Sequence, residues 1–416
     1  MSTIYAEATP AGRGGVSVVR LSGPEARSIA EAIAGPLPVA RRAELRSLRD
    51  GDLIDRALVI RFDERASFTG EEVVEFQLHG APVIVRRLEA ALRSRGARLA
   101  EAGEFTRRGL LGGALALSEV EALSDLLAAE SEAQRQQAMR VVSGELARWA
   151  DGLRERLVRA GALIEVSLDF ADEEVPDEVP DEVFALLASV RQDISAALAG
   201  LPAAERLRAG FEVAIVGPPN AGKSSLLNRI ARREMALVSD IAGTTRDVLE
   251  LHTELGGLAV VFLDTAGLRQ AEDVVEGLGV DRARERARRA DLRLHLSEDG
   301  RAVDELYQEG DLVLRSKADL GGPGISAVTG FGIASMLEKM RERLAERVAG
   351  AGLVTRKRQA DALEDALEVL AVDKGQPAEF LAEAVRQASH RLGDVVGKIA
   401  PDDYLDEIFS RFCIGK

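Results

Sequence analysis

Apolar positions in the first part of the chain fall into short runs with strand character. The runs VSVVRLSG, RALVIRF and EEVVEFQLHG alternate apolar and polar residues or hold a continuous apolar core, as half-buried strands do. One stretch, APVIVRRLEAALRSRG, instead repeats apolar residues every three or four positions and predicts an amphipathic helix. These patterns predict a compact α+β domain over residues 1–117.

From residue 118 the apolar spacing changes to three and four. The proline-free stretch from SEVEALSDLL to GALIEVSLDF predicts long paired helices, and VFALLASVRQDISAALAG predicts another. Between them the acidic stretch DFADEEVPDEVPDE, with two prolines, predicts a solvated loop. Helical spacing returns in RKRQADALEDALEVLAV and continues to the end. We therefore predict one helical domain in two halves, residues 118–207 and 349–416.

The pattern of apolar residues between these halves, over residues 208–348, is different. Four apolar runs, FEVAIVG, LAVVFLDTAG, LRLHLS and DLVLRS, are separated by helical segments, which is typical of a doubly wound parallel sheet. The predicted fold class is multidomain α/β: an N-terminal α+β domain, a helical domain in two halves, and an inserted doubly wound domain.

Composition and charge limit the functions that this chain can have. With 54 Lys and Arg against 69 Asp and Glu, the 416-residue chain carries a formal charge of −15, so its global field repels polyanions and any nucleic-acid contact must be local. The single cysteine excludes an internal disulfide framework. The N-terminus lacks the order of a signal peptide, and no apolar run looks long enough to span a membrane, so we expect a cytoplasmic protein.

The segment GPPNAGKSS, residues 217–225, fits the pattern G-x-x-x-x-G-K-[ST] between a strand-like run and a helix-like one. In such a P-loop the glycines let backbone N–H groups face phosphate oxygens, Lys223 reaches the β- and γ-phosphates, and the Ser224 hydroxyl ligates Mg²⁺. The predicted phosphate site comprises Asn220, Ala221, Gly222, Lys223, Ser224 and Ser225.

Two further motifs indicate a nucleotide switch that selects guanine. LDTAG ends a strand and places Asp264 near the metal and Gly267 where a γ-phosphate is sensed, so the site includes Asp264, Thr265, Ala266 and Gly267. In SKAD, the Asp319 carboxylate can accept from both donors of the guanine edge, with Lys317 over the base. SAVTG resembles the last guanine-contacting loop of GTPases. The predicted base site comprises Ser316, Lys317, Asp319, Ser326 and Ala327.

These motifs, in this order, resemble the translation-factor-related GTPases, with two departures. That family usually has Asn where Ser316 stands, and the shorter side chain gives up a hydrogen bond worth about 0.5–1.5 kcal/mol, so we expect weakened guanine selectivity. The interval between the DTAG and SKAD motifs is short and predicts a trimmed edge helix.

The residue after DTAG is Leu268, so the water-orienting Gln of Ras-like proteins is absent. Asn220 and the segment VSDIAGTTRD resemble GTPases that bind K⁺ between subunits, where the cation replaces an arginine finger. Ordinary turn chemistry remains an alternative for Asn220. The resemblance implies that Thr245 ligates Mg²⁺ and that K⁺ is held by Asn220, Thr244 and the carbonyls of Ser239 and Ile241.

Joined to the C-terminal FCIGK and to TIYAEATPAGRGGVSVVRLSGP, SFTGEEVVEFQLHG and AGEFTRRGLL, these motifs resemble the MnmE (TrmE) family of tRNA modification GTPases over nearly the whole chain. The resemblance implies an N-terminal domain that binds a tetrahydrofolate derivative (5,10-methylene or 5-formyl) and mediates homodimerisation. It also implies an FAD-dependent partner, GidA (MnmG). Together they would install an aminomethyl-type group, including carboxymethylaminomethyl, at carbon 5 of the wobble uridine of certain tRNAs.

The same resemblance implies particular site residues. Arg20, Glu75 and Lys416 match folate-contacting positions, whereas Ala114 stands where the family commonly has a Lys. Glu276 matches the catalytic Glu that orients the attacking water; a solvated acid before the basic helix DRARERARR is the alternative.

The single cysteine, Cys413, lies in the C-terminal CIGK and admits three interpretations. Gly415 and Lys416 fit a prenylation box poorly, and a buried small hydrophobe packed with neighbouring phenylalanines is the second possibility. We favour a thiol that acts in catalysis beside Lys416.

Two other functions stay open. One is a ribosome-assembly or RNA-binding regulatory GTPase of the same superfamily, although such proteins usually append a basic module. The other is a folate-dependent methyltransferase with a vestigial GTPase domain.

Overall fold

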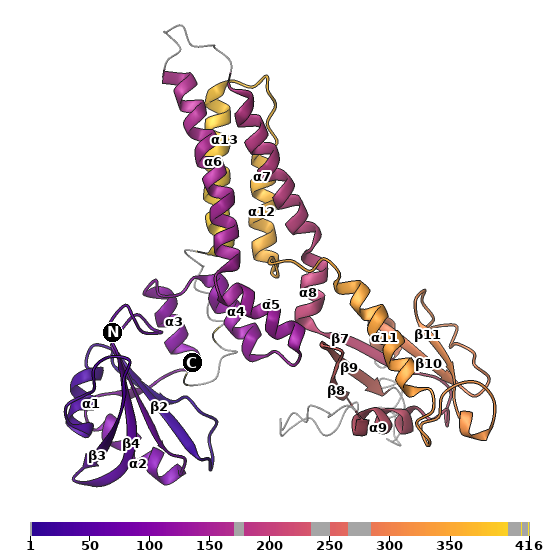
Figure 1. Ribbon diagram of the computed structural model, residues 1–416, viewed down its shortest axis with the longest axis horizontal. Helices are drawn as coiled ribbons and strands as arrows, with labels where there is room; N and C mark the ends of the chain where they lie inside the picture. The colour runs from indigo at the N-terminus through magenta and orange to yellow at the C-terminus, as the bar shows by residue number, and fades with distance from the viewer. Residues whose placement is uncertain are drawn as a thin grey trace, which may run out of the picture. The chain divides into compact units, whose positions relative to one another are not determined.

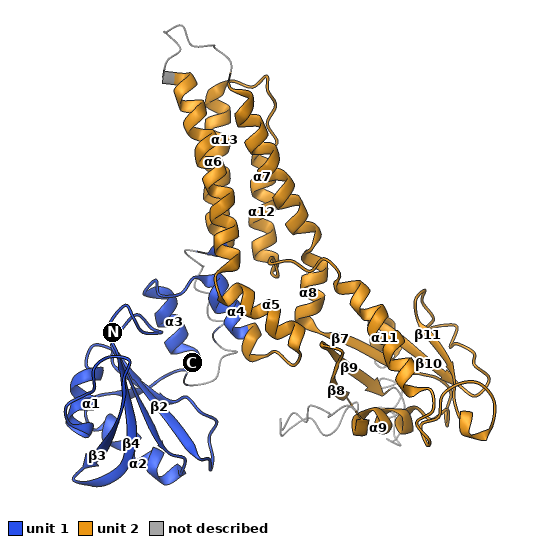
Figure 2. Ribbon diagram, in the orientation of Figure 1, with its two compact units in different colours: residues 1–124, 396–416 blue, residues 125–395 orange. Residues whose placement is uncertain are grey.

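The computed structural model describes residues 2–169, 179–233, 250–264, 284–397, 409 and 415. The chain forms two compact units, shown in blue and orange in Figure 2. The first joins residues 1–124 to the C-terminal residues 396–416, and the second comprises residues 125–395. Residues 170–178 of the predicted acidic loop, 169–182, lie outside the described residues, whereas its last two residues, Asp181 and Glu182, already belong to a helix. The three boundaries between the four predicted segments remain a prediction.

The first unit is built on a six-stranded sheet of order β3-β4-β5-β2-β1-β6, in which only β1 and β6 pair in parallel. Alternate residues of the central strands, such as Val19, Leu21 and Phe76, are fully buried because successive side chains of a strand point to opposite faces. They form one core with α1 and α2. The strands are β1 (Ile4–Glu7), β2 (Val16–Ser22), β3 (Ala43–Asp50), β4 (Asp52–Phe62), β5 (Val73–His79) and β6 (Arg98–Leu99); the helices are α1 (Ala26–Ala34), α2 (Pro82–Arg93), α3 (Glu104–Leu111) and, at the unit boundary, α4 (Leu117–Leu127).

The second unit contains a bundle of long helices (Figure 1). Buried residues of α6 recur at Leu146, Ala150, Leu153, Leu157, Ala160 and Ile164. This four-three alternation keeps one apolar seam on the helix, and Val385 of α13 packs beside Gly161. The predicted helical domain is thereby confirmed. Its helices are α5 (Glu132–Val142), α6 (Glu145–Asp169), α7 (Asp181–Ala199), α8 (Leu201–Ala209), α12 (Lys357–Val369) and α13 (Ala378–Val396).

The segment between α8 and α12 forms a five-stranded sheet of order β11-β10-β7-β9-β8. Helices α9 and α11 pack on it in one apolar cluster, and Ala287, Ala290 and Leu306 pack with Ala214 and Val216 in a second. The doubly wound domain is thus confirmed. Its elements are β7 (Phe211–Val216), α9 (Lys223–Arg233), β8 (Glu250–Leu255), β9 (Leu258–Asp264), β10 (Leu292–Ser297), β11 (Leu312–Arg315), η2 (Ala318–Leu320) and α11 (Ile333–Val348).

The sheet departs from the sequence expectation at both edges. An edge strand that the apolar pattern did not reveal, β8, pairs antiparallel with β9. At the other edge, residues 298–311 connect β10 to β11 without a helix, whereas the short motif interval predicted a trimmed one.

One described stretch, Asp181–Ala209, is long and apolar enough to meet a membrane-span criterion by length and composition, contrary to our reading of the sequence. This is weak evidence, since the stretch comprises α7 and α8, and buried residues such as Val183, Leu187 and Val190 give α7 the seam of a bundle helix.

Candidate functional site

The P-loop turns sharply between β7 and α9. A Cβ atom on Gly217 would lie 2.0 Å from the carbonyl oxygen of Leu296 in β10, so only glycine fits where the loop leaves the strand. Asn220 has φ 62° and Gly222 has φ 96°, the left-handed conformations that a phosphate-cradling loop uses to turn its N–H groups inward. The loop therefore has the backbone that its motif predicts.

The charged and hydroxyl side chains of the phosphate site converge. Lys223 is buried, and its Nζ donates to the carbonyl oxygens of Gly217 and Pro218 at 2.9 Å each. The Ser224 hydroxyl donates to Asp264 Oδ2 at 2.8 Å, across 40 residues of sequence. Hydroxyl and carboxylate oxygens are the ligands that Mg²⁺ prefers, so this pair fits the metal of a nucleotide site. Ala221 is buried beneath the loop, and Ser225 is exposed.

The base site is assembled from β11, η2 and the loop before α11. The Ser326 hydroxyl donates to Asp319 Oδ1 at 2.6 Å, which fixes the carboxylate that we expect to read guanine. Lys317 has φ 58° and pairs with Glu298, and Ala327 packs at the edge of the core. Ser316 is buried, yet its Oγ finds no hydrogen-bond partner among the described residues. An unpaired buried hydroxyl costs stability, and the weakened guanine selectivity expected from Ser316 stays a prediction.

Arg229 belongs to this site, although no motif in the sequence indicates it. From α9 its guanidinium donates to the carbonyl oxygens of Val328 and Thr329, at 3.5 and 3.2 Å. It thereby connects the P-loop helix to the guanine-recognition loop.

Several predicted site residues lie outside the described residues, so the structure says nothing of them. They are Thr265, Ala266, Gly267 and Glu276 near the γ-phosphate, Ser239, Ile241, Thr244 and Thr245 of the cation site, and Cys413 and Lys416 of the tail.

A second group of predicted residues meets in the first unit. Arg20 and Glu75 are register partners on β2 and β5, and Arg20 Nε donates to Glu75 Oε1 at 2.9 Å. The Arg20 guanidinium lies 5.7 Å from the ring centroids of both Phe68 and Phe105, within cation–π range. Its Nη1 also donates to the carbonyl oxygen of Gly415 at 3.4 Å. Gly415, the described residue of the C-terminal CIGK, therefore contacts Arg20, one of the predicted folate residues.

Sequence analysis missed Phe68 and Phe105, although both lie in quoted hallmark segments. No spacing rule marks them, because their rings meet Arg20 only after the sheet and α3 have folded. Ala114 lies beside this region: a Cβ atom on Gly70 would be 3.5 Å from the Ala114 methyl group.

An ion-pair network supports the segment that carries Phe68. Arg108, 6% exposed, pairs with Glu71 and Glu104, and Arg98 pairs with Glu104 as well. Burial, the largest single effect, raises the pKa of the Glu104 carboxyl, but hydrogen bonds from Arg98, the Glu101 N–H and Arg108 together lower it to about 2. Glu104 therefore stays ionised at neutral pH and holds α3 in place.

Comparison with known families covers most of the chain. Residues 3–114 match the family described as GTP-binding protein TrmE N-terminus. Residues 117–413 match the MnmE helical domain family.

Whole-chain relatives agree with these matches. The chain is 62% identical over 420 residues to the tRNA modification GTPase MnmE of Paracoccus denitrificans, and 50% identical over 429 residues to that of Roseobacter denitrificans; each alignment spans all of both chains. Among solved structures, Era in complex with MgGDPNP and a segment of 16S ribosomal RNA is 24% identical over 40% of this chain and 69% of its own, with a TM-score of 0.26, which supports no conclusion. The family models and the full-length relatives show that this chain belongs to the MnmE family of tRNA modification GTPases.

Proposed function

We propose that this chain is a K⁺-stimulated, Mg²⁺-dependent GTPase that acts as a cytoplasmic homodimer. With an FAD-dependent partner of the GidA (MnmG) kind, it installs an aminomethyl-type group, including carboxymethylaminomethyl, at carbon 5 of the wobble uridine of certain tRNAs. A tetrahydrofolate derivative, 5,10-methylene or 5-formyl, supplies the one-carbon unit.

The observation that carries the proposal is the hydrogen bond between Arg20 and the Gly415 carbonyl. Gly415 directly precedes Lys416 and follows Cys413 by two residues, so its contact with Arg20 supports a tail that acts beside the residues expected to bind folate. A cation flanked by two aromatic rings and one carboxylate suits a flat heteroaromatic ligand that carries carboxylates. Folate has this chemistry, and bound there it would supply a one-carbon unit.

The nucleotide site supports the GTPase part of the proposal. Ser224 and Asp264 present hard oxygen ligands to Mg²⁺, and Lys223 lies buried beside the loop carbonyls, where its charge faces the phosphates. Asp319, held by Ser326, presents acceptors to the guanine edge. Conformational change on hydrolysis would be transmitted through the DTAG segment.

The deciding experiment measures wobble nucleosides by mass spectrometry in tRNA from cells that lack this protein. Complementation with the wild-type chain should restore a modified uridine, Cys413→Ser should not, and the neighbouring control Ser410→Ala should. Restoration by Cys413→Ser would make the thiol structural. Full modification in the deletion strain would favour the ribosome-assembly alternative instead.

The dependence of GTP hydrolysis on the cation tests the proposed K⁺ site. Hydrolysis should be faster in KCl than in NaCl at equal ionic strength, and Asn220→Ala should remove that difference. Glu276→Ala should slow hydrolysis while GTP affinity stays nearly constant, because the residue is expected to orient water. Equal rates in both salts would contradict the K⁺ site.

A further inference from the structure

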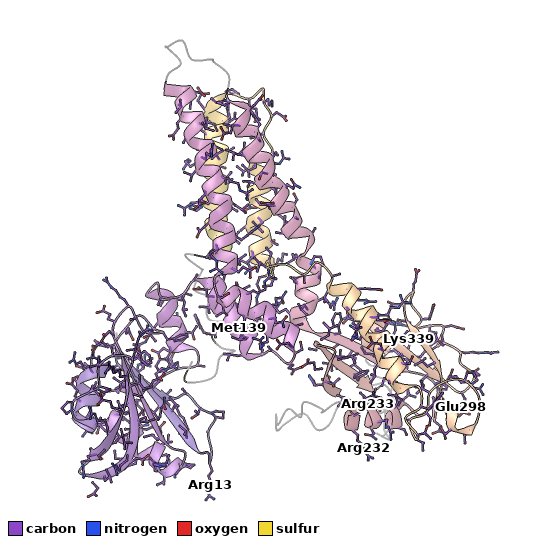
Figure 3. All side chains as sticks on the ribbon, in the orientation of Figure 1. Arg13, Met139, Arg232, Arg233, Glu298 and Lys339 are labelled. Atoms are coloured by element: carbon purple, nitrogen blue, oxygen red, sulfur yellow. The ribbon has the colours of Figure 1, made fainter. Side chains whose placement is uncertain are left out.

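A hollow of about 370 Å³ lies at the end of the P-loop helix. Its lining comes from α9, from the guanine-recognition loop and from the first residue of α11: Arg229, Arg232, Arg233, Thr329, Gly330 and Ile333. Figure 3 labels Arg232 and Arg233 at the end of α9, and both are exposed. The nucleotide motifs do not use Arg232 or Arg233, and no function described above requires this hollow.

Two of the three arginine charges of the hollow, those of Arg229 and Arg232, are poorly neutralised within the described ranges. Arg232 forms no hydrogen bond or ion pair with any residue in the described ranges, and no ion pair involves Arg229 there. Arg229 donates only to two carbonyl oxygens, which satisfy its N–H groups but bring no negative charge. Elsewhere on this domain the exposed Arg289 pairs with Glu285, and the half-buried Arg286 and Arg341 also pair with carboxylates. The hollow is thus a local positive site on a chain with net charge −15.

Helical spacing gathers these charges on one side. Positions 229, 232 and 233 are related by three and four residues, so their side chains neighbour one another on the helix surface. Like charges at this spacing destabilise a helix by themselves. A favourable interaction of the helix end with cations explains one arginine, but it does not explain a hollow lined by three.

We propose that this hollow binds phosphate groups of the tRNA backbone. Planar guanidinium groups recognise phosphate through paired hydrogen bonds, and the Thr329 hydroxyl adds a donor. An RNA strand fits better than a free anion, because exposed arginines on successive helix positions can engage consecutive phosphates, and only a polymer supplies these. The inference rests on the proposed function, which makes tRNA the substrate.

Binding here has a structural consequence for the nucleotide. Arg229 contacts the loop that contains Ser326, and Ser326 holds Asp319. A phosphate drawn toward Arg229 therefore acts on the loop that reads guanine, and tRNA and GTP affinities become linked.

The test is binding of fluorescently labelled bulk tRNA to the full-length chain with GDP bound, measured between about 50 and 200 mM salt. Each phosphate contact contributes about 0.7–0.9 to the slope of log affinity against log salt. Arg232→Gln with Arg233→Gln should lower the slope by about 1–2, and Arg232→Lys alone should keep it. Arg343→Gln with Arg347→Gln, which replaces two exposed arginines of α11 outside the hollow, is the matched control and should leave it unchanged.

Three results would overturn the inference. They are equal slopes for wild type and the α9 double variant, no salt-dependent tRNA binding by wild type, and inorganic phosphate binding that tRNA does not compete with, which indicates a small-anion site. The complementation assay of tRNA modification distinguishes failure of this inference from failure of the proposed function. A wild-type chain that restores modification while the slopes stay equal refutes the hollow alone, and one that restores nothing refutes the proposed function.

Discussion

Two serines of the nucleotide domain show how position decides the role of one side chain. Ser224 is the second residue of α9, and its hydroxyl donates to Asp264 Oδ2 at 2.8 Å. The two oxygens are therefore close enough to ligate one metal ion. Ser316 lies buried at the end of β11, and its hydroxyl has no partner among the residues that the structure describes. A serine hydroxyl is thus hydrogen-bonded in the phosphate site, at Ser224, and has no hydrogen-bond partner among the described residues in the base site, at Ser316.

This difference predicts the effect of changing Ser316. Ser316→Asn should tighten GDP binding by about two- to tenfold, because a longer amide can restore a hydrogen bond worth about 0.5–1.5 kcal/mol. Ser316→Ala should change the affinity by less than about threefold, since the hydroxyl makes no hydrogen bond with any described residue. Titration with a fluorescent GDP analogue measures both. A large loss in Ser316→Ala would mean that the hydroxyl contacts the nucleotide.

At the scale of elements, the connection from β10 to β11 shows how a sheet edge is held without its helix. Arg293 is almost fully buried and pairs with Asp311, and it also donates to the carbonyl oxygens of Ala287, Arg288 and Ala290. His295 contacts the same Asp311 carboxylate. Burial raises the pKa of Asp311, but hydrogen bonds from Arg293, the Gln308 N–H and His295 lower it overall. Polar contacts of one aspartate thus tie the connecting loop to the sheet.

Removing this aspartate should destabilise the domain strongly. Asp311→Ala leaves the buried Arg293 charge unpaired, and we expect a loss of about 3–5 kcal/mol in the free energy of unfolding. Denaturant unfolding measures it, with the exposed neighbour Glu309→Ala as control. Equal stability of the two variants would show that the buried pair contributes nothing.

The ion pairs of α3 predict an acid-sensitive first unit. The pKa of Glu104 is lowered from 4.5 to about 2, so its contribution to stability is fully present above pH 4.5 and is lost as the pH falls toward 2. Glu104→Gln should lower stability by about 1.5–3 kcal/mol at neutral pH and by much less near pH 2. Urea unfolding at both pH values tests this, and a pH-independent difference would contradict it.

At the scale of the whole molecule, the inserted domain is attached through two chain crossings that lie close together. A Cβ atom on Gly200, before α8, would lie 2.7 Å from the carbonyl oxygen of Gly350, after α11. Arg356 donates to Asp125 at 2.6 Å, and Arg208 Nη1 lies 4.0 Å from the same oxygen. Because entry and exit meet at one carboxylate, the domain can be inserted without separating the helices of the bundle.

Within the first unit, Gly415 near the C-terminus lies against Glu7 of β1. Substitution of Gly415 tests whether this contact is needed for function. Gly415 has φ 103°, and a Cβ atom there would lie 2.5 Å from the carbonyl oxygen of Glu7. A left-handed conformation costs other residues about 1–2 kcal/mol, and the close contact adds to this. Gly415→Ala should therefore displace the tail and lower tRNA modification while GTP hydrolysis stays unchanged. Gly375→Ala, in open space, is the control; full modification in both would refute the role of the tail.

Local patterns of apolar residues predict most of the helices and strands. The strands around the P-loop and helix α6 of the bundle are predicted from apolar spacing, because a buried face requires apolar residues at a regular interval along the chain. The edge strand β8 and the N-terminal β3 were missed because few of their residues are buried, two of six in β8 and one of eight in β3, so their sequences show little apolar alternation.

The sequence by itself determined the nucleotide chemistry, because a P-loop is a contiguous segment whose glycines, lysine and serine act through local backbone geometry. Tertiary structure alone decided which distant residues act together: Ser224 with Asp264, Arg229 with the guanine loop, and Arg20 with Phe68, Phe105 and Gly415. Such contacts join segments 40 to 395 residues apart. They depend on strand register and helix packing, which no local pattern in the chain specifies.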